Sequence, residues 1–539
     1  MSTPDTKSRL PLWLLDVAVV LGLAGLTLWL RWPSLGTEGF HNEDAAGIAY
    51  NADLIRRGLR PLVDNLEYKA PGSFFLSYLG WAMFGRSLST LVGLACFWSM
   101  LAAIGVYVGG RLLYNRRREA IVAGVLYAVL SPVTDSIDIN YGAWLITPYI
   151  WSTVFFIAGQ RSGKRRWTFA AGVTLALAGL MKRQAAVIFP VFAGLLIIQH
   201  LLARPEQWPQ IDTSTRRRLQ HGGALVGGLA AGFGSLMLVY AVWGGLGDFV
   251  GHYFFSSAGW QYVGGSTDFS GKISRLGDGF LGLWEYLALP SALALTTLVG
   301  ARSGSTEGTP WTFRGVLLTA HFWMSFVGIA LGFRFFKSYY LQLLPAAVWI
   351  AAHPEGALVR WMRPELWRGS RGFKLGQGAL ALVMLVALIP AGMGDIEELG
   401  KIRKWRTRPR DGEAQRVARV IKKETKADDT IWVWGRWAWP VYYHADRMSP
   451  TRYYKVLGVV TNGLTNTWRR STQKTKFVAV GPHQEIVDEL AAARPAFIVT
   501  SNNEDYSGWK AFRALLKDEY VQQRKLRLRS FKLWKRKDL

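Results

Sequence analysis

Apolar stretches of membrane-spanning length recur along most of the chain, from Leu10 to about Ala391, with short polar connectors between them. A helix needs roughly 20 apolar residues to cross a bilayer core, and many of these stretches are that long. After Asp395 apolar residues become sparse and charged residues become dense. The pattern predicts a polytopic α-helical membrane protein of about eleven transmembrane helices, with a transmembrane domain over residues 1–394 and a C-terminal soluble α/β domain over residues 395–539.

Basic clusters in four connectors orient these helices. Cytoplasmic loops of membrane proteins carry an excess of Lys and Arg, so the clusters place the N-terminus in the cytoplasm. They are Arg111 with Arg116–Arg118, Arg161 with Lys164–Arg166, Arg204 with Arg216–Arg218, and Arg360, Arg363, Arg368, Arg371 and Lys374. The spans that fit this orientation lie near residues 12–30, 88–110, 119–135, 142–160, 168–181, 185–203, 221–243, 280–300, 315–333, 339–352 and 376–394. Their odd number predicts an extracytoplasmic C-terminal domain on a multi-pass cell-membrane protein, such as one of a bacterial inner membrane.

Composition narrows the class of protein further. A formal net charge of +27 would suggest nucleic-acid binding in a soluble protein. In a membrane protein the bias toward positive cytoplasmic loops accounts for it, and no basic-aromatic nucleic-acid module is visible. Cys96 is the only cysteine, which excludes a disulfide framework and a cysteine zinc site. The apolar run Leu12–Leu30 is too long for a signal peptide and is expected to be a retained first helix.

Ten basic residues fall on the outer side of this arrangement, at or near helix ends. Charges placed against the topological bias indicate a bound anion near the outer leaflet, and a phosphate-bearing lipid fits that position. For Lys182, Arg183 and Gln184, which interrupt an apolar run, ordinary turn charges explain the pattern better than a functional role does. The ten residues are Arg56, Arg57, Arg60, Lys69, Lys182, Arg183, Lys272, Arg275, Arg334 and Lys337.

The first outer loop, residues 31–87, has the most informative pattern. Glu43 and Asp44 open a predicted helix that Asn42 can cap and Gly58 ends. Ile48, Ala52 and Ile55 recur along it at helical spacing, which is also compatible with a helix on the membrane surface.

The loop resembles that of a known family. The order of its features closely resembles the first extracytoplasmic loop of the GT-C glycosyltransferases. These features are an acidic pair, an alanine-rich helix that ends in Gly, then Pro61 and Asp64, and finally the step Lys69-Ala70-Pro71-Gly72 before Phe84-Gly85. The nearest relatives look like the protein O-mannosyltransferase and aminoarabinose transferase group. Residues 334–345 resemble the family's motif before a late helix, and segments within 431–454 resemble the soluble domain of many members. Two features depart from the family: Glu43 precedes Asp44, and Ser338-Tyr339 replaces a common His-Tyr pair.

The resemblance implies an inverting transferase that moves a hexose or pentose from a polyprenyl-phosphate carrier to an extracytoplasmic hydroxyl of a glycan, lipid or protein. Such a reaction needs a base for the hydroxyl and cations for the departing phosphate, and one carboxylate on the attacking face suffices. Glu43 and Asp44 are the candidate bases, although acids there also complement a helix dipole. Lys69, Arg334 and Lys337 are the candidate phosphate ligands, with snorkelling at the interface as the alternative.

Three further residues are candidates for acceptor binding or support. Asp135 and Asp138 follow Pro132 in the second outer loop, where a merely solvated loop is the alternative, and Tyr340 belongs to the late-helix motif. The chemistry requires no cofactor, and a divalent ion held by Glu43, Asp44 and the donor phosphate is the open alternative. The expected partners are the lipid-linked sugar donor, the acceptor and membrane lipids. A transporter or flippase of lipid-linked sugars is the competing function, although the repeated halves typical of transporters are not visible.

Within residues 395–539 the periodicity predicts helices over 414–423 and 484–493 and strands over 430–434 and 496–500. Near the end of the chain, apolar residues alternate with basic ones as in a lysine-protected edge strand. These apolar residues are Leu526, Leu528, Phe531 and Leu533.

Overall fold

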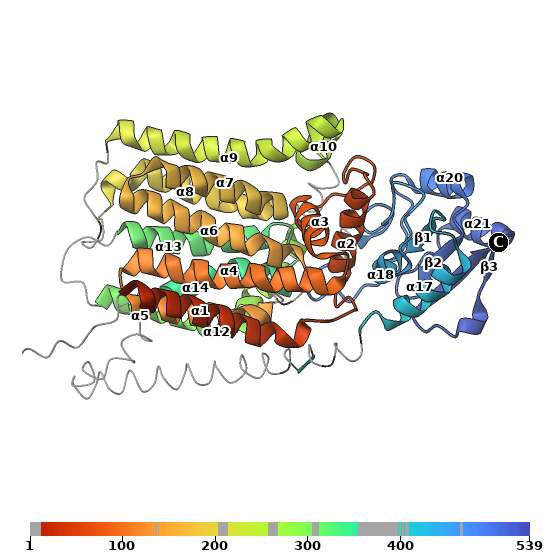
Figure 1. Ribbon diagram of the computed structural model, residues 1–539, viewed down its shortest axis with the longest axis horizontal. Coiled ribbons are helices and arrows are strands. Elements are labelled where there is room, and N and C mark those ends of the chain that lie inside the picture. Colours follow the sequence, from red (N-terminus) through yellow and green to blue (C-terminus); the bar gives the residue numbers. More distant parts are fainter. Residues whose placement is uncertain are drawn as a thin grey trace, which may run out of the picture.

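The computed structural model describes residues 12–134, 139–202, 214–256, 268–303, 312–353, 409–463 and 467–539, with single residues between these ranges. A bundle of long helices that run in roughly the same direction makes up the larger part (Figure 1). A smaller α/β region lies beyond one end of this bundle, and two shorter helices separate the two parts.

The bundle is formed by ten helices of the described residues. They are α1 (Leu12–Arg31), α4 (Leu88–Tyr114), α5 (Arg117–Leu130), α6 (Tyr141–Ser162), α7 (Arg165–Met181), α8 (Phe189–Ile198), α9 (Thr215–Trp243), α12 (Phe269–Ser303), α13 (Phe313–Ala330) and α14 (Leu344–Ala351). The short helix α10 (Leu246–Phe254) follows α9. Each of the first ten expected spans overlaps one of these helices, and the eleventh, 376–394, lies outside the described residues.

Among the residues that the structure describes, six segments are long and apolar enough to cross a membrane, judged by length and composition. The total of about eleven crossings stays a prediction. The six segments are Trp13–Ser34, Leu88–Tyr114, Tyr141–Ser162, Arg183–Leu201, Thr215–Trp243 and Phe313–Ala330.

Glycines allow α7 and α9 to approach closely. A Cβ atom at Gly172 of α7 would lie 2.2 Å from the Leu225 carbonyl oxygen, and one at Gly228 of α9 would lie 2.1 Å from the Phe169 carbonyl oxygen. Small residues at such positions let helix backbones touch, which replaces the hydrophobic driving force that is missing between helices in lipid. The packing of α7 matters for function because its C-terminal end carries Lys182.

The first outer loop folds into α2 (Glu43–Arg56) and α3 (Gly72–Phe84), which lie between the bundle and the α/β region (Figure 1). The predicted cap is confirmed, since the Asn42 side chain accepts a hydrogen bond of 2.8 Å from the Ala45 backbone N–H. Residues 45–55 are all buried, so α2 is covered by protein and does not lie on the membrane surface. Its apolar spacing reflects packing against α3 and the α/β region.

The α/β region contains a four-stranded mixed sheet. Its helices are α17 (Gly412–Glu424), α18 (Pro440–Ala445), α20 (His483–Ala493) and α21 (Lys510–Glu519), and its strands are β1 (Ile431–Trp434), β2 (Phe497–Ser501), β3 (Tyr520–Gln522) and β4 (Phe531–Arg536). The strand order is β1-β2-β4-β3, with β1 and β2 parallel and the other pairs antiparallel. The two predicted helices and two predicted strands are all present, within two residues at each end.

The prediction that the last strand lies at the edge of the sheet is wrong. β4 lies inside the sheet, hydrogen-bonded to β2 on one side and to β3 on the other. Phe531 and Leu533 are buried while Lys532 is exposed, so the alternation separates the two faces of an interior strand. Leu526 and Leu528 precede the strand.

The first loop and the α/β region contact each other at the same end of the bundle. The Leu66 backbone N–H donates to the Arg452 carbonyl at 2.8 Å, and the Asn51 side chain donates to the Tyr454 hydroxyl at 3.1 Å. At the other end, Asp16 of α1 pairs with Arg117 at 2.9 Å. The shared end agrees with the odd number of crossings, and the side of the membrane on which it lies stays a prediction.

Candidate active site

An acidic and a basic residue meet where α2 faces the bundle. The Asp44 carboxylate forms an ion pair with the Lys69 ammonium group, and their side chains are 46% and 15% exposed. The same ammonium group lies 4.3 Å above the ring of Tyr141. Burial disfavours the ionised carboxylate, but Lys69, and then Lys182, outweigh it and hold the pKa of Asp44 below its ordinary value. Asp44 is therefore ionised at neutral pH.

The pair lines a small cavity of about 60 Å³, which we call the inner cavity. Lys182 and Arg183 line it as well, with Tyr141 and Tyr339 among its aromatic residues. The Lys182 ammonium lies 3.3 Å from the centre of the Tyr339 ring. Three basic side chains surround one carboxylate there, so the cavity carries a net positive charge and suits an anion.

Close packing between α3 and α7 assembles this cavity. α7 ends at Met181, Lys182 is extended, and the 3₁₀ helix η3 (Arg183–Ile188) follows directly. A Cβ atom at Gly72 would lie 2.7 Å from the Leu180 carbonyl oxygen, so only glycine lets the start of α3 dock against the end of α7. This contact brings the Lys69 loop beside Lys182. The charges at 182 and 183 therefore line a cavity and are not merely turn charges.

A second cavity of about 240 Å³, the middle cavity, adjoins the first and shares Asp44, Tyr68, Lys69, Ser338 and Tyr339 with it. Glu43, Asn42 and Lys337 line only the middle one of these two cavities. Within the part of the chain that the structure describes, the Glu43 side chain makes no hydrogen bond or ion pair. The two candidate bases thus differ: Asp44 is paired to a lysine, and Glu43 is open to a cavity.

A buried ion pair supports the loop that carries Lys69. The Glu67 carboxylate pairs with the Lys455 ammonium group, and both side chains are only 1% exposed. Glu67 also accepts hydrogen bonds from the Tyr454 hydroxyl at 2.6 Å and from the backbone N–H groups of Tyr68 at 2.8 Å and Lys69 at 2.9 Å. Burial favours the neutral acid, but Lys455 and Lys69 hold the pKa of Glu67 below its ordinary value. The α/β region thereby fixes the backbone of Lys69.

Comparisons with known proteins bear on the fold of the chain. A family model described as dolichyl-phosphate-mannose-protein mannosyltransferase matches residues 68–212. The crystal structures of ArnT from Cupriavidus metallidurans, one bound to undecaprenyl phosphate and one in the apo state, are 13% identical, and each match covers 97% of both chains with TM-scores of 0.57 and 0.58. The chain has the GT-C glycosyltransferase fold.

A second solved structure similar to this chain is the oligosaccharyltransferase of Archaeoglobus fulgidus in its apo form. That structure is 12% identical, and the match covers 90% of this chain and 69% of that one with a TM-score of 0.51. A comparison with curated protein sequences finds no match. The resemblance noted in the first outer loop is confirmed. The family match begins at Tyr68, so it includes Lys69, Lys182 and Arg183, whereas Glu43 and Asp44 precede it.

Several predicted site residues lie elsewhere. Arg334 is 1% exposed, donates a hydrogen bond to the Thr467 carbonyl and lines neither cavity. Tyr340 is fully buried, and its hydroxyl donates to the Gly279 carbonyl at 2.7 Å, so Tyr339 faces the cavities in its place. Both tyrosines belong to the 3₁₀ helix η5 (Lys337–Gln342), where three residues per turn send neighbouring side chains about 120° apart. Asp135 and Asp138 lie outside the described residues.

Lys455 and Tyr141 are the site residues that sequence reasoning missed. Lys455 follows the Tyr453-Tyr454 pair that resembled the family's soluble domain, and a lysine in an aromatic, buried segment was the available signal. No group of three His, Cys, Asp or Glu side chains that could hold a metal ion occurs among the described residues. A divalent ion would depend on Glu43, Asp44 and oxygens of its own ligand.

Proposed function

We propose that the chain is an inverting membrane glycosyltransferase that moves a sugar from a polyprenyl-phosphate carrier to a hydroxyl group of an extracytoplasmic acceptor. One observation carries the proposal: the Asp44 carboxylate shares the inner cavity with Lys69, Lys182 and Arg183. This cavity lies between the first outer loop and the end of an apolar helix bundle. A lipid tail can remain among the helices while its phosphate reaches the basic side chains.

The chemistry follows from the two kinds of charge. The donor phosphate binds Lys69, Lys182 and Arg183 and replaces Asp44 as the partner of Lys69. The acceptor oxygen then forms a bond to the anomeric carbon, and the bond from that carbon to the phosphate oxygen breaks. The released electron pair stays on the phosphate, where the three cations stabilise it. The acceptor proton passes to a carboxylate.

Asp44 is the favoured base because it lines both the inner and the middle cavity, where donor and acceptor would meet. Its pairing with Lys69 keeps it ionised in the free protein, and loss of that partner to the phosphate would raise its basicity when the donor is bound. Glu43 opens to the middle cavity and is the alternative base or an acceptor contact.

The neighbouring structures support a lipid phosphate as the donor group. ArnT from Cupriavidus metallidurans was crystallised with undecaprenyl phosphate, and its structure aligns with this chain over 97% of both lengths. A polyprenyl phosphate is the ligand that the inner cavity's charge and its place beside the bundle suit as well.

The proposal is tested with the purified full chain, radiolabelled undecaprenyl-phosphate sugars and a panel of envelope glycans, lipids and proteins. Asp44→Asn should reduce transfer by about 10²–10⁴-fold, the usual contribution of a general base. Glu38→Gln, an exposed acid of the same loop that lines none of these cavities, serves as the matched control and should retain activity. Full transfer in both Asp44→Asn and Glu43→Gln would reject the carboxylate mechanism.

A transporter of lipid-linked sugars is separated from a transferase by the fate of the bond. The same donor is placed on one side of sealed vesicles that contain the protein. A transferase leaves free polyprenyl phosphate and a glycosylated acceptor, whereas movement of the intact donor without cleavage would favour transport.

A further inference from the structure

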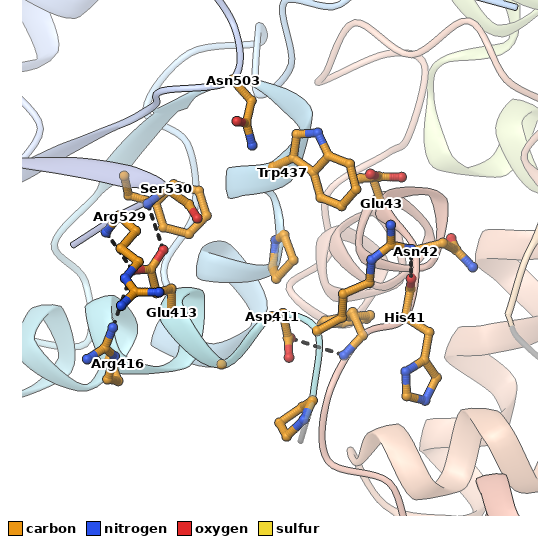
Figure 2. A pocket seen from close by; sticks show the side chains of 16 residues that line it. His41, Asn42, Glu43, Asp411, Glu413, Arg416, Trp437, Asn503, Arg529 and Ser530 are labelled. Carbon is orange, nitrogen blue, oxygen red and sulfur yellow. Dashed lines mark hydrogen bonds and ion pairs between the residues drawn. The ribbon is translucent and has the colours of Figure 1, made fainter. Parts of the chain in front are cut away.

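A third cavity of about 410 Å³ lies between the first loop and the α/β region, and we call it the outer cavity (Figure 2). Residues 40–43 form one wall, and Arg410, Trp437, Asn503 and Arg529 are among the residues of the other. We infer that the outer cavity binds a saccharide unit of the acceptor, with a sugar ring against Trp437. This inference rests on the proposed function and names the chemical class of its acceptor.

Trp437 gives the cavity an aromatic platform. Its side chain is partly exposed, and it projects from the α/β region toward the end of α2 that carries Glu43 (Figure 2). The guanidinium groups of Arg410 and Arg436 lie 5.0 and 5.6 Å from the centre of its ring, within the range of cation–π contacts. The apolar C–H face of a pyranose ring matches an indole face, while its hydroxyl edge matches surrounding polar side chains.

Hydrogen bonds within the protein make the walls rigid. Asp411 accepts hydrogen bonds from the Phe40 backbone N–H at 3.0 Å and from His444 at 2.7 Å, which joins the first loop to the α/β region. Glu413 accepts from the backbone N–H groups of Arg529 at 2.6 Å and Ser530 at 2.8 Å. These acids are occupied in shaping the cavity, so they are poor candidates for direct ligand contacts.

Other polar groups of the lining are open to a ligand. Among the described residues, the side chains of Glu43, Asn503 and Arg529 make no hydrogen bond or ion pair with the protein. A carboxylate, an amide and a guanidinium offer planar acceptors and donors, the groups that bind vicinal hydroxyls in pairs.

The charge of the lining favours a neutral ligand. Three arginines (Arg410, Arg416 and Arg529) face three acids (Glu43, Asp411 and Glu413), and His41, whose pKa burial lowers to about 4, is neutral at pH 7. A site for a phosphate or a polyanionic chain needs an excess of cations, as the inner cavity has. A balanced lining with an aromatic platform fits a sugar ring better than it fits a lipid phosphate.

The three cavities adjoin in an order that suits two substrates. The outer cavity shares Asn42 and Glu43 with the middle cavity, which shares Asp44 and Lys69 with the inner one. A volume of about 410 Å³ lies within the range of small-molecule sites and accommodates one or two sugar rings. The acceptor would enter from the water-facing side, and the donor from the bundle, with the two carboxylates between them.

The test measures binding of methyl glycosides of glucose, galactose, mannose and N-acetylglucosamine to the full chain in detergent by saturation-transfer NMR. At least one glycoside should give signals in the wild type that weaken about tenfold or more in Trp437→Ala and partly persist in Trp437→Phe. Trp468→Ala is the matched control, because Trp468 also lies under a guanidinium, at 4.8 Å from Arg275, and does not line the outer cavity. Its signals should equal those of the wild type.

Asn503 and Arg529 are exposed, so a loss of glycoside binding in variants at these positions would not be explained by misfolding. Asn503→Ala and Arg529→Ala should each weaken glycoside binding several-fold with an unchanged unfolding midpoint. The inference would be overturned if the wild-type chain bound none of the glycosides, or if the signals survived in Trp437→Ala. Binding of a peptide alone would also overturn it and would assign the cavity to a protein acceptor.

Donor turnover separates this inference from the proposed function. Lys69→Ala should abolish sugar transfer and leave glycoside binding intact, because Lys69 does not line the outer cavity. Transfer that persists in a chain without glycoside binding would remove only the inference. Glycoside binding without any transfer would remove only the proposed function.

Discussion

The buried pair of Glu67 and Lys455 offers the sharpest test of how the α/β region serves the site. Lys455→Met removes the charge and nearly preserves the volume of a side chain that is 1% exposed. Removal of one partner from a buried ion pair typically costs about 3–5 kcal/mol, because the other charge is left uncompensated. Glu67 keeps its bonds from Tyr454 and two backbone N–H groups, so we expect the lower end, about 3 kcal/mol.

The same change should reach the inner cavity through the backbone. Glu67 accepts the Lys69 backbone N–H at 2.9 Å, so a shift of the carboxylate moves the residue that pairs with Asp44. A displacement of about 1 Å in a catalytic group can cost roughly 100-fold in rate. We therefore expect kcat to fall by about that factor in Lys455→Met, with little change in the KM for the acceptor.

Denaturant unfolding in detergent and steady-state kinetics measure both effects. Glu67→Gln combined with Lys455→Met should destabilise the chain less than the sum of the single variants, because a neutral pair leaves no buried charge. Lys510→Met, at an exposed position of the same region, should change stability by less than about 0.5 kcal/mol. Stability and kcat of Lys455→Met that match this control would refute the coupling.

Three further predictions concern the first outer loop and the inner cavity. Arg86→Lys should lower the free energy of unfolding by about 1–3 kcal/mol, because lysine cannot replace both hydrogen bonds that Arg86 donates to buried Asp53, at 2.8 and 2.6 Å. An unchanged midpoint of thermal unfolding would contradict this. Lys182→Ala should raise the KM for the donor about tenfold and not that for the acceptor, as one lost charge-assisted contact predicts; equal effects on both would refute it. Cations hold the pKa of Asp44 below its ordinary value, so the carboxylate becomes protonated only at a pH below the ordinary pKa of an aspartic acid. We therefore expect no fall in kcat/KM between about pH 7 and pH 5. An inflection near pH 6 would count against Asp44 as the base.

Local patterns in the sequence were sufficient for much of the fold. Apolar runs predicted the bundle helices, and the spacing from Asn42 to Ala45 predicted the start of α2, since both depend on neighbours in sequence. Strand order depends on distant pairings, so the alternation near Phe531 could not show that β4 lies between β2 and β3. The eleventh span, 376–394, lies outside the described residues.

Residues of the first-loop motif lie together in the structure, whereas a partner that the tertiary fold supplies from far along the chain was missed. Asp44 and Lys69, which both belong to the first-loop motif, form an ion pair although they are 25 positions apart. Lys455 lies 388 positions from Glu67, and no local pattern predicts such a partner. The choice of Tyr339 over Tyr340 depends on the rotation of one short 3₁₀ helix, which sequence alone does not determine.

A structure of the full chain with bound undecaprenyl phosphate tests the central claim most directly. We expect the phosphate in the inner cavity, with an oxygen within hydrogen-bond distance, about 3.2 Å or less, of the Lys69 ammonium, and with the Asp44 carboxylate released from that lysine. A phosphate bound beside Arg334, outside the inner cavity, with the pair of Asp44 and Lys69 intact, would contradict it.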